Sequence, residues 1–370
     1  MKTRKVYLIK DSAFTGAQIL TQDINIKDPI QSFDVLIRMT NGAGMTEAST
    51  VKIHDEFTNF ELADGADVLV SASMEELQGL HVLDNTSLPD MHMTLEDDAV
   101  QREGFRISFG LDDVDMKHYL DPSRYYNPRL KITNTFTAAA ATTWAAAGHT
   151  ITVIANVIDE GAEANEGFLS PKSIYAFTAV DGAEVVIEMP RDMDYRAVMI
   201  QSMVTGSRPD QTLEVVKLTC DADKYVPINV DTDDLMSQNI ALLGGFTERL
   251  DKRITGAGTI CTDLFYDTHG IVTQDTSVSH PGLVTTDADV ISVEIDVGAA
   301  GVDANSAVEG LVSASISGYS LHSCMYLPFG KLDNPSSWFK AAEYGNIKLK
   351  LTGEASAGAV RVLTQQLRMV

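Results

Sequence analysis

The stretch Asn127-Pro128-Arg129-Leu130-Lys131-Ile132-Thr133 returns near the end of the chain as Asn346-Ile347-Lys348-Leu349-Lys350-Leu351-Thr352. In both copies apolar and polar residues alternate. A period of two is typical of a strand with one buried and one solvated face. Its recurrence predicts an antiparallel sheet that occurs twice in the chain.

Other segments recur in the same order on either side of this pair. The matched strands are Val35-Leu36-Ile37 with Val198-Met199-Ile200, Val51-Lys52-Ile53 with Val216-Lys217-Leu218, and residues 147–153 with residues 357–363. The matched helical stretches are Met74-Glu75-Glu76-Leu77 and Thr232-Asp233-Asp234-Leu235. We interpret this order as a duplication that produces two like units.

Each unit is expected to contain a short helix. Ser73 and Glu76 have the spacing of a capping box, in which the side chain of each residue bonds the backbone N–H of the other. The second helix is predicted over residues 231–243, capped by Asp231 or Thr232 and ended by Gly244 and Gly245. Many strands, few helices and glycine-rich turns predict an all-β chain of two tandem antiparallel sandwiches, each with eight strands.

The length of 370 residues allows two domains, each with its own core. The acidic, glycine-rich segment 159–172 separates residues 1–165 from residues 166–370. In the first unit 50 residues separate Leu77 from Asn127, whereas 111 separate Leu235 from Asn346. The second unit should therefore carry a long loop insertion within about residues 244–335.

Composition excludes several classes of function. The formal charge of −24 argues against direct binding of nucleic acid, because phosphate contacts need a basic surface. No apolar run reaches the roughly 18–20 residues of a membrane span, and we expect no signal peptide. The three cysteines, Cys220, Cys261 and Cys324, lack metal-binding spacing and are expected to be free, mostly buried thiols.

Positive charge gathers at the N-terminus, where Lys2, Arg4, Lys5 and Lys10 precede an acidic chain. A basic arm of this kind can bind anionic lipid headgroups or an acidic neighbouring subunit. A solvated terminus without a partner would have the same composition.

The sequence offers no positive case for catalysis. The histidines form no zinc motif, and no nucleophile elbow, phosphate-binding loop or dinucleotide fingerprint occurs. His54, beside Asp55 and Glu56, is expected in a solvated turn rather than as a base or metal ligand. Three acidic groups lack the glycine and distal glutamate of a calcium loop: Asp112-Asp113-Asp115, Asp221-Asp223 and Asp231-Asp233-Asp234. We therefore predict a protein that is not an enzyme, with no catalytic residues, metal or cofactor.

Two tandem sandwiches, each with a short helix, together with passages such as Tyr125-Tyr126 followed by residues 127–133, resemble the double jelly-roll major capsid proteins of tailless icosahedral, membrane-containing bacteriophages and viruses. The resemblance covers nearly the whole chain. It implies a structural protein of the virion capsid, assembled in the host cytoplasm as homotrimers with a pseudo-hexameric outline. It also implies contacts with neighbouring capsomers and with penton or minor capsid proteins. The insertion would form outer towers, and the N-terminal region would lie near an internal lipid membrane.

Two other classes of protein share parts of this pattern. A tandem jelly-roll carbohydrate-binding protein or glycan-cleaving enzyme is one, although Trp144 and Trp338 are the only tryptophans that could serve as sugar platforms. A cellular surface or fibre protein is the other.

Overall fold

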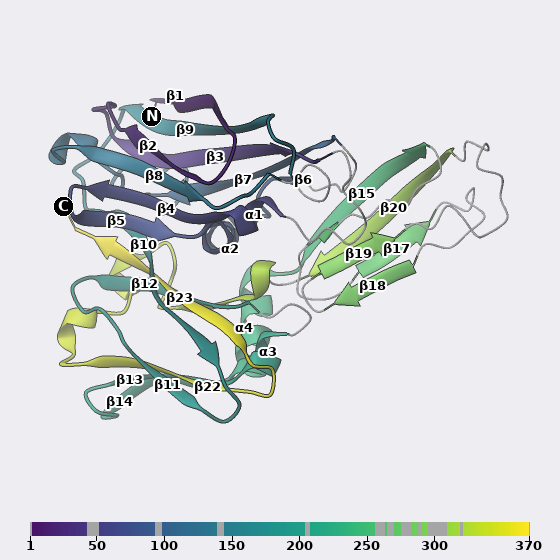
Figure 1. Cartoon of the computed structure of the whole chain (residues 1–370). Coiled ribbons are helices and arrows are strands. Elements are labelled where there is room, and N and C mark those ends of the chain that lie inside the picture. Colours follow the sequence, from purple (N-terminus) through teal and green to yellow (C-terminus); the bar gives the residue numbers. More distant parts are fainter. Residues whose placement is uncertain are drawn as a thin grey trace.

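The computed structural model describes residues 2–42, 52–92, 98–138, 144–203, 208–255 and 321–369, together with five short strands between residues 263 and 318. No helix within these residues is long and apolar enough to cross a bilayer. Their architecture is two β-sandwiches with a few short helices (Figure 1).

The first sandwich, called here the first roll, is built from the N-terminal half of the chain. Its strands are β1 (Lys2–Phe14), β2 (Gln18–Asp23), β3 (Ile30–Thr40), β4 (Phe57–Asp64), β5 (Asp67–Ala72), β6 (Met91–His92), β7 (Val100–Ser108), β8 (Pro128–Asn134) and β9 (His149–Glu160). Its helices are α1 (Ile53–Glu56), α2 (Met74–Asn85) and the 3-10 turn η1 (Pro122–Arg124). One sheet has the order β1-β9-β3-β7-β6, and β2-β8-β4-β5 lie side by side in the other.

The second roll repeats this topology. Its strands are β10 (Phe168–Ala179), β11 (Glu184–Glu188), β12 (Asp194–Ser202), β13 (Leu213–Cys220), β14 (Tyr225–Asp231), β21 (Cys324–Pro328), β22 (Ile347–Gly353) and β23 (Gly358–Arg368). Its helices are α3 (Pro209–Thr212), α4 (Thr232–Leu243), η2 (Leu321–Ser323), η3 (Pro335–Ser337) and η4 (Ala341–Glu343). Apart from the two-residue strand β6, which has no counterpart, the orders β10-β23-β12-β21 and β11-β22-β13-β14 reproduce those of the first roll strand for strand. The predicted duplication, with eight main strands per unit, is confirmed.

The predicted equivalences hold to different degrees. The match of residues 127–133 with 346–352 is right. Lys131 of β8 lies opposite Glu61 of β4, and Lys350 of β22 lies opposite Lys217 of β13, which is the corresponding strand pair of the second roll. The match of Val35 with Val198 is wrong by two residues. Phe109 donates a backbone hydrogen bond to the carbonyl of Gln31, and Phe329 donates the corresponding bond to Arg196, so Gln31 and Arg196 are equivalent. Two residues further along each strand, the counterpart of Val198 is therefore Phe33.

Two further matches need correction. Ile53 starts helix α1, whose counterpart is α3, whereas Val216 lies in β13 and corresponds to Phe60 of β4. The alignment of the closing strands β9 and β23 is wrong by one residue. Ala155 pairs with Phe33 and Thr364 pairs with its equivalent Val198, so Ala155 corresponds to Thr364. The predicted alignment matches Ala155 with Gln365 instead. A slip of one residue exchanges the faces of a strand, so the core faces decide this register.

The two rolls are joined edge to edge. Strand β10 runs parallel to β5, with Lys172 opposite Ser71, so an eight-stranded sheet β2-β8-β4-β5-β10-β23-β12-β21 continues from one roll into the other. Strand β1 lies at one outer edge of this body and β14 at the opposite one (Figure 1). Strand β9 ends at Glu160 and β10 begins at Phe168. We propose that the boundary between the two units lies at residue 165, between these strands.

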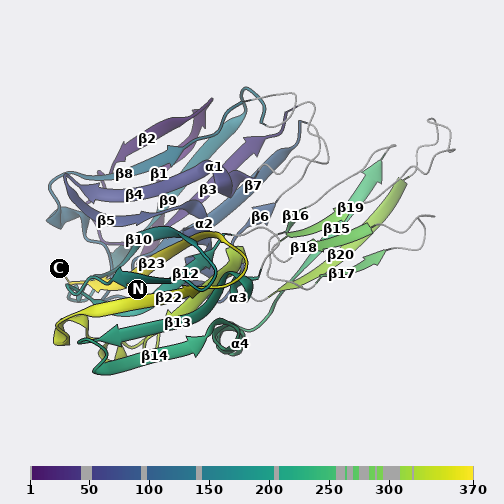
Figure 2. The same ribbon diagram turned by 60° about the horizontal axis from the view of Figure 1, so that its bottom comes forward.

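The insertion between α4 and β21 differs from the expected loops. It contains β15 (Phe246–Thr255), β16 (Asp263–Leu264), β17 (Gly270–Gln274), β18 (Leu283–Asp287), β19 (Val290–Glu294) and β20 (Glu309–Gly318). They form two antiparallel sheets, β15-β20-β17 and β16-β19-β18, which project beyond the helix end of the rolls (Figure 2). The serines of β20 alternate with apolar residues, which is the pattern of a strand rather than a loop.

Candidate functional site: a basic edge strand and a polar junction

The four N-terminal basic residues lie on a paired strand rather than on a free arm. Strand β1 pairs with β9 along its length, from Lys2 opposite Glu160 to Phe14 opposite His149. Lys2 and Arg4 lie near one end of the strand and Lys10 toward the other, so the four cations do not form a single cluster. That Lys2, Arg4, Lys5 and Lys10 face a membrane or a neighbouring subunit stays a prediction.

These cations have acidic or aromatic partners within the chain. The Arg4 guanidinium contacts the carboxylates of Asp28 and Asp159, each at 2.5 Å, and its hydrogen bond to Asp159 raises the pKa of Arg4. The other contacts are Lys2 with Glu160 at 2.6 Å, Lys5 with Asp34 at 3.7 Å, and Lys10 with the Tyr7 ring at 5.2 Å from its centroid. Partners of this kind weaken the attraction to anionic lipid below that of free cations.

Helix α2 lies at the junction of the two rolls. Ser73 and Glu76 form the predicted capping box, with hydrogen bonds of 3.3 and 2.8 Å. The Tyr326 hydroxyl, from the second roll, donates a hydrogen bond of 2.6 Å to the Gly79 carbonyl. A Cβ at Gly79 would lie 2.6 Å from Sγ of Cys324, so only glycine allows this approach.

One buried and one partly buried ion pair cross the same junction. Arg196 of β12 pairs with Asp84 of α2, and the two side chains are only 2% and 5% exposed. Gln365 completes this group, donating to Asp84 at 3.1 Å and accepting from Arg196 at 2.5 Å. Arg361 contacts Glu75 at 2.8 Å, and burial raises the pKa of the Glu75 carboxyl. Charged groups as deeply buried as Arg196 and Asp84 need such partners, so the network fixes how the rolls meet.

His54 is buried rather than in a solvated turn, which corrects the expectation from sequence. It is 3% exposed, and its Nδ1 lies 3.0 Å from Oε2 of Glu103. Gln78 also donates to Glu103, at 3.0 Å, and its Oε1 lies 2.6 Å from Nε2 of His322. Burial lowers the pKa of His54, but the Glu103 carboxylate outweighs that effect and raises it to about 9. Burial and the nearby His54 ring lower the pKa of His322 well below its usual value.

One group of side chains in the described part of the chain has the geometry of a metal site. Ligand atoms of His54, Asp55 and Glu75 lie within 4.8 Å of one another. Glu103 already engages Nδ1 of His54, and Arg361 neutralises Glu75. We assign these residues to the ionic network of the junction.

The acidic groups noted in the sequence have structural roles. Asp115 accepts hydrogen bonds from the backbone of Leu111 and Lys117, each at 2.9 Å, and Asp221 accepts one from Gly345 at 2.6 Å. Asp231 occupies the N-cap of α4 without the expected side-chain cap. These contacts stabilise turns.

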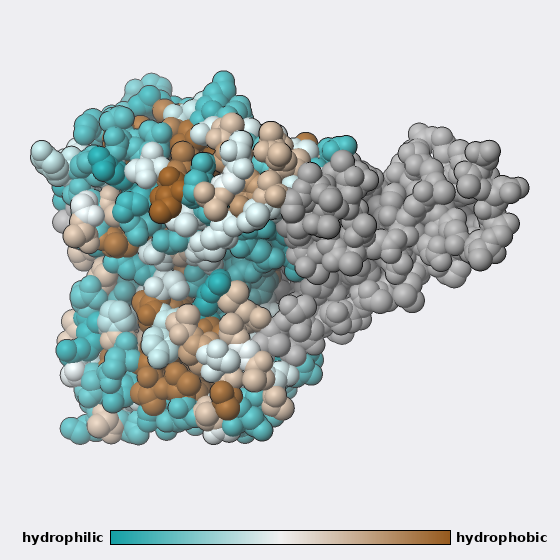
Figure 3. Space-filling model, viewed as in Figure 1, coloured by the Kyte–Doolittle hydropathy of each residue, from teal (hydrophilic) through white to brown (hydrophobic). Residues whose placement is uncertain are grey.

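The aromatic residues do not form a sugar platform of tryptophans. Trp144 is 0% and Trp338 3% exposed, so both belong to the interior. Cys220 and Cys324 are buried as predicted, whereas Cys261 lies outside the described residues. In Figure 3, hydrophilic side chains cover much of the visible face and apolar ones form separate patches over each roll.

The fold is that of known viral capsid proteins. The chain is similar over its full length to the major capsid protein of Sulfolobus turreted icosahedral virus, with a TM-score of 0.62, 10% identity and 97% of that chain covered. It is similar to the major capsid protein P2 of bacteriophage PM2, with a TM-score of 0.53, 10% identity and 98% coverage. The corresponding values for the PBCV-1 protein VP54 are 0.56, 10% and 94%. No family model and no curated protein matches the sequence. The protein thus has the double jelly-roll fold that the sequence predicted.

Proposed function

We propose that this protein is the major subunit of an icosahedral virion shell. The observation that carries the proposal is the side-by-side joining of two rolls with the same strand order, in a chain matched end to end by capsid proteins. A structural role also agrees with the polar network of the junction, which fixes the two rolls to each other.

Three copies would place six similar rolls around one axis. Two like units in one chain supply two of the six positions of a hexagon, so a homotrimer can tile a hexagonal lattice. Closed rotational symmetry is the usual form of homo-oligomers, and it allows many weak contacts to add up. Neighbouring capsomers and penton or minor capsid proteins would contact the outer faces of such a trimer.

The two ends of the rolls have different roles in this proposal. The insertion projects from the end where the helices lie, whereas Lys2 and Glu160 lie at the opposite end. The insertion would face outward, and the end with Lys2 and Arg4 would face an internal lipid membrane. Flotation with anionic vesicles tests this orientation: weak, salt-sensitive binding is expected, and binding that persists in high salt or is absent in low salt contradicts it.

Size-exclusion chromatography with light scattering tests the assembly. A stable trimer is expected. A protein that remains monomeric at all accessible concentrations would contradict the proposed function and would favour a binding module or enzyme instead.

A further inference from the structure

Four polar side chains form a closed circuit where the chain returns from the insertion to the second roll. The Glu103 carboxylate accepts hydrogen bonds from Nδ1 of His54 and Nε2 of Gln78, each at 3.0 Å. Oε1 of Gln78 accepts a further hydrogen bond, of 2.6 Å, from Nε2 of His322. The rings of His54 and His322 close the circuit, with their centroids 4.5 Å apart. All four residues are buried, so the loss of one of these contacts is costly.

The circuit ties the short turn η2 to the first roll. His54, Gln78 and Glu103 belong to that roll, on α1, α2 and β7. His322 lies in η2, between the end of β20 at Gly318 and the start of β21. The returning end of the insertion is therefore fastened to the first roll before the chain enters the second.

The backbone of η2 is held in an unfavourable conformation. His322 and Ser323 have φ values of 53° and 51°, in the left-handed region that residues other than glycine seldom adopt. Both residues are nevertheless buried. A conformation of this kind persists only while its surroundings hold it, so η2 should relax when the contacts of His322 are lost.

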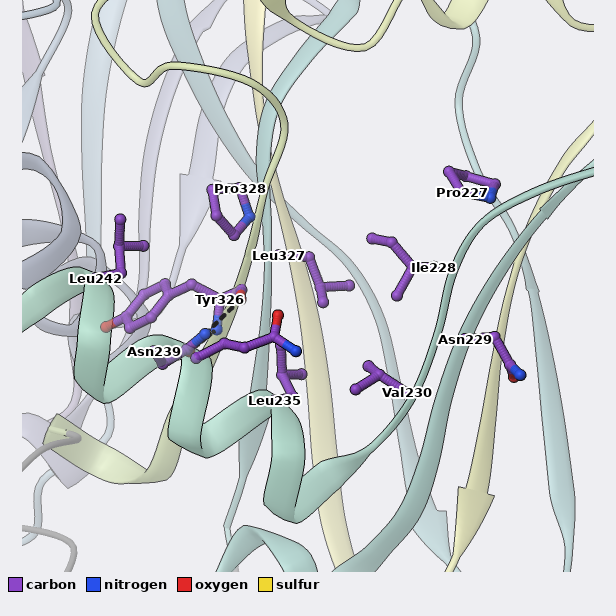
Figure 4. A pocket seen from close by; sticks show the side chains of 11 residues that line it. Pro227, Ile228, Asn229, Val230, Leu235, Asn239, Leu242, Tyr326, Leu327 and Pro328 are labelled. Atoms are coloured by element: carbon purple, nitrogen blue, oxygen red, sulfur yellow. Dashed lines mark hydrogen bonds between the residues drawn. The ribbon is translucent and has the colours of Figure 1, made fainter.

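Beyond η2 the chain is held by other contacts. The side chain of Asn239, on α4, donates to the Tyr326 carbonyl at 2.9 Å and accepts from the Tyr326 N–H at 2.6 Å (Figure 4). The Tyr326 hydroxyl bonds the Gly79 carbonyl. These contacts do not involve the circuit, so β21 should stay in place when η2 is released.

The two histidines of the circuit differ in charge. Glu103 stabilises the imidazolium of His54, whose pKa is raised to about 9. Burial, the charged His54 and Lys52 all lower the pKa of His322 well below its usual value of 6.5, so its ring is neutral. A proton added to His322 would place two imidazolium rings in contact and away from water, where like charges repel strongly.

The other ionisable groups described in this region do not supply a counter-charge for His322. Each of the four carboxylates acts on another group: Glu103 and Asp55 on His54, Glu75 on Arg361, and Glu76 on the backbone N–H of Ser73. Burial raises the pKa of the Cys324 thiol well above its usual value, so it is neutral. The end of β12, which also packs on η2, carries no ionisable side chain from Val198 to Ser202.

We propose that this circuit is an acid-sensitive latch, in which protonation of His322 releases η2 from the first roll and frees the returning end of the insertion. The latch lies within one chain, so it goes beyond the proposed shell and does not depend on it. Below pH 6.5 the released ring binds one proton that the latched ring does not. The released fraction should therefore increase about tenfold for each pH unit, until the latched ring itself titrates.

Thiol labelling at Cys324 measures the release. Its sulfur is buried and lies 3.7 Å from the carbonyl oxygen of His322, so the thiol should become accessible when η2 moves away. A pyridyl disulfide, which reacts with thiols in acid solution, would be applied between about pH 8 and 5, and the labelled peptides quantified by mass spectrometry.

The rate at each pH is divided by the rate for the unfolded chain. Labelling of Cys324 should then increase about tenfold per pH unit below 6.5. Cys220, which is buried in the core of the second roll, is the internal control and should keep a constant relative rate.

Three substitutions make the test specific to the circuit. His322→Gln keeps a donor for Gln78 but stays neutral, so the acid response at Cys324 should disappear. His322→Asn, which suits the left-handed backbone, should have the same effect. His54→Gln removes the neighbouring charge, so release should require a lower pH. His81→Gln is the matched control, because burial also lowers the pKa of this histidine of α2, and it should leave the response unchanged.

The outcomes separate the latch from the proposed shell. Labelling of Cys324 that does not depend on pH overturns the latch, and so does an acid response that persists in both His322 variants. A parallel rise at Cys220 would show that the chain unfolds as a whole and also overturns it. A monomer by light scattering that shows the acid response contradicts the shell and supports the latch. A trimer without the response supports the shell and overturns the latch.

Discussion

Tyr326 of the second roll donates its hydroxyl proton to the carbonyl of Gly79 in the first, across 2.6 Å. Both residues are buried, and the contact places a strand of one roll against a helix of the other. The junction is therefore held by specific polar contacts as well as by apolar packing.

Removing this hydroxyl should destabilise the junction. Tyr326→Phe leaves the ring in place and removes one buried hydrogen bond, at an expected cost of about 1–3 kcal/mol in the free energy of unfolding. Urea denaturation measures the change. Tyr7→Phe, at a side chain that is 56% exposed, is the control and should change stability by less than about 0.5 kcal/mol. Equal effects of the two substitutions would argue against the assigned role.

Asp84→Asn should be more damaging, because it leaves the Arg196 guanidinium buried without a carboxylate. Breaking a buried ion pair from one side costs about 3–5 kcal/mol. Glu160→Gln removes the carboxylate of an exposed pair with Lys2 and should cost less than about 1 kcal/mol. A loss at Asp84 as small as that at Glu160 would show that the junction tolerates the uncompensated charge.

His54 should make stability fall in alkaline solution. Its pKa is raised from 6.5 to about 9 in the folded protein, so the charged His54–Glu103 pair contributes fully below pH 6.5. That contribution is lost as pH rises through about 9. Denaturation at a series of pH values should show a decline over this window, and His54→Gln should flatten it. An unchanged slope in the variant would refute the assignment.

The close approach at Gly79 predicts coupling with Cys324. Gly79→Ala places a methyl group against the sulfur, and overpacking of this kind costs about 1–3 kcal/mol, offset in part by the helix preference of alanine. In a Cys324→Ala background the same substitution should cost less. Gly16→Ala, where a Cβ meets no atom within 4 Å, is the control. Strict additivity in the double-mutant cycle would contradict the contact.

The sequence was sufficient to predict the duplication, because the strand 127–133 and its copy alternate cleanly and both helices have recognisable ends. Helix α2 begins at Met74, directly after its N-cap Ser73, and α4 ends before Gly244, whose φ of 75° favours glycine. Register was harder to predict. A slip of two residues keeps every side chain on the same face, so alternation alone does not distinguish Phe33 from Val35 as the counterpart of Val198.

The junction left a weaker signal in the sequence. Strand β23 is buried on both faces, since Val362 packs in the second core while Leu363 meets the first roll, and its alternation is therefore blurred. The sequence predicted a solvated His54 because its immediate neighbours are polar and acidic. Its partner Glu103 is far away in sequence, so the buried pair could not be recognised from the local pattern. The available hint was charge in apolar surroundings, such as Arg196 within a strand that is otherwise largely hydrophobic.

Electron microscopy of the purified protein tests most directly whether two like rolls make a pseudo-hexameric capsomer. Class averages along the principal axis should show three copies arranged as a closed ring of six lobes with a hexagonal outline. Single two-lobed particles, twofold dimers or open filaments would contradict the proposal.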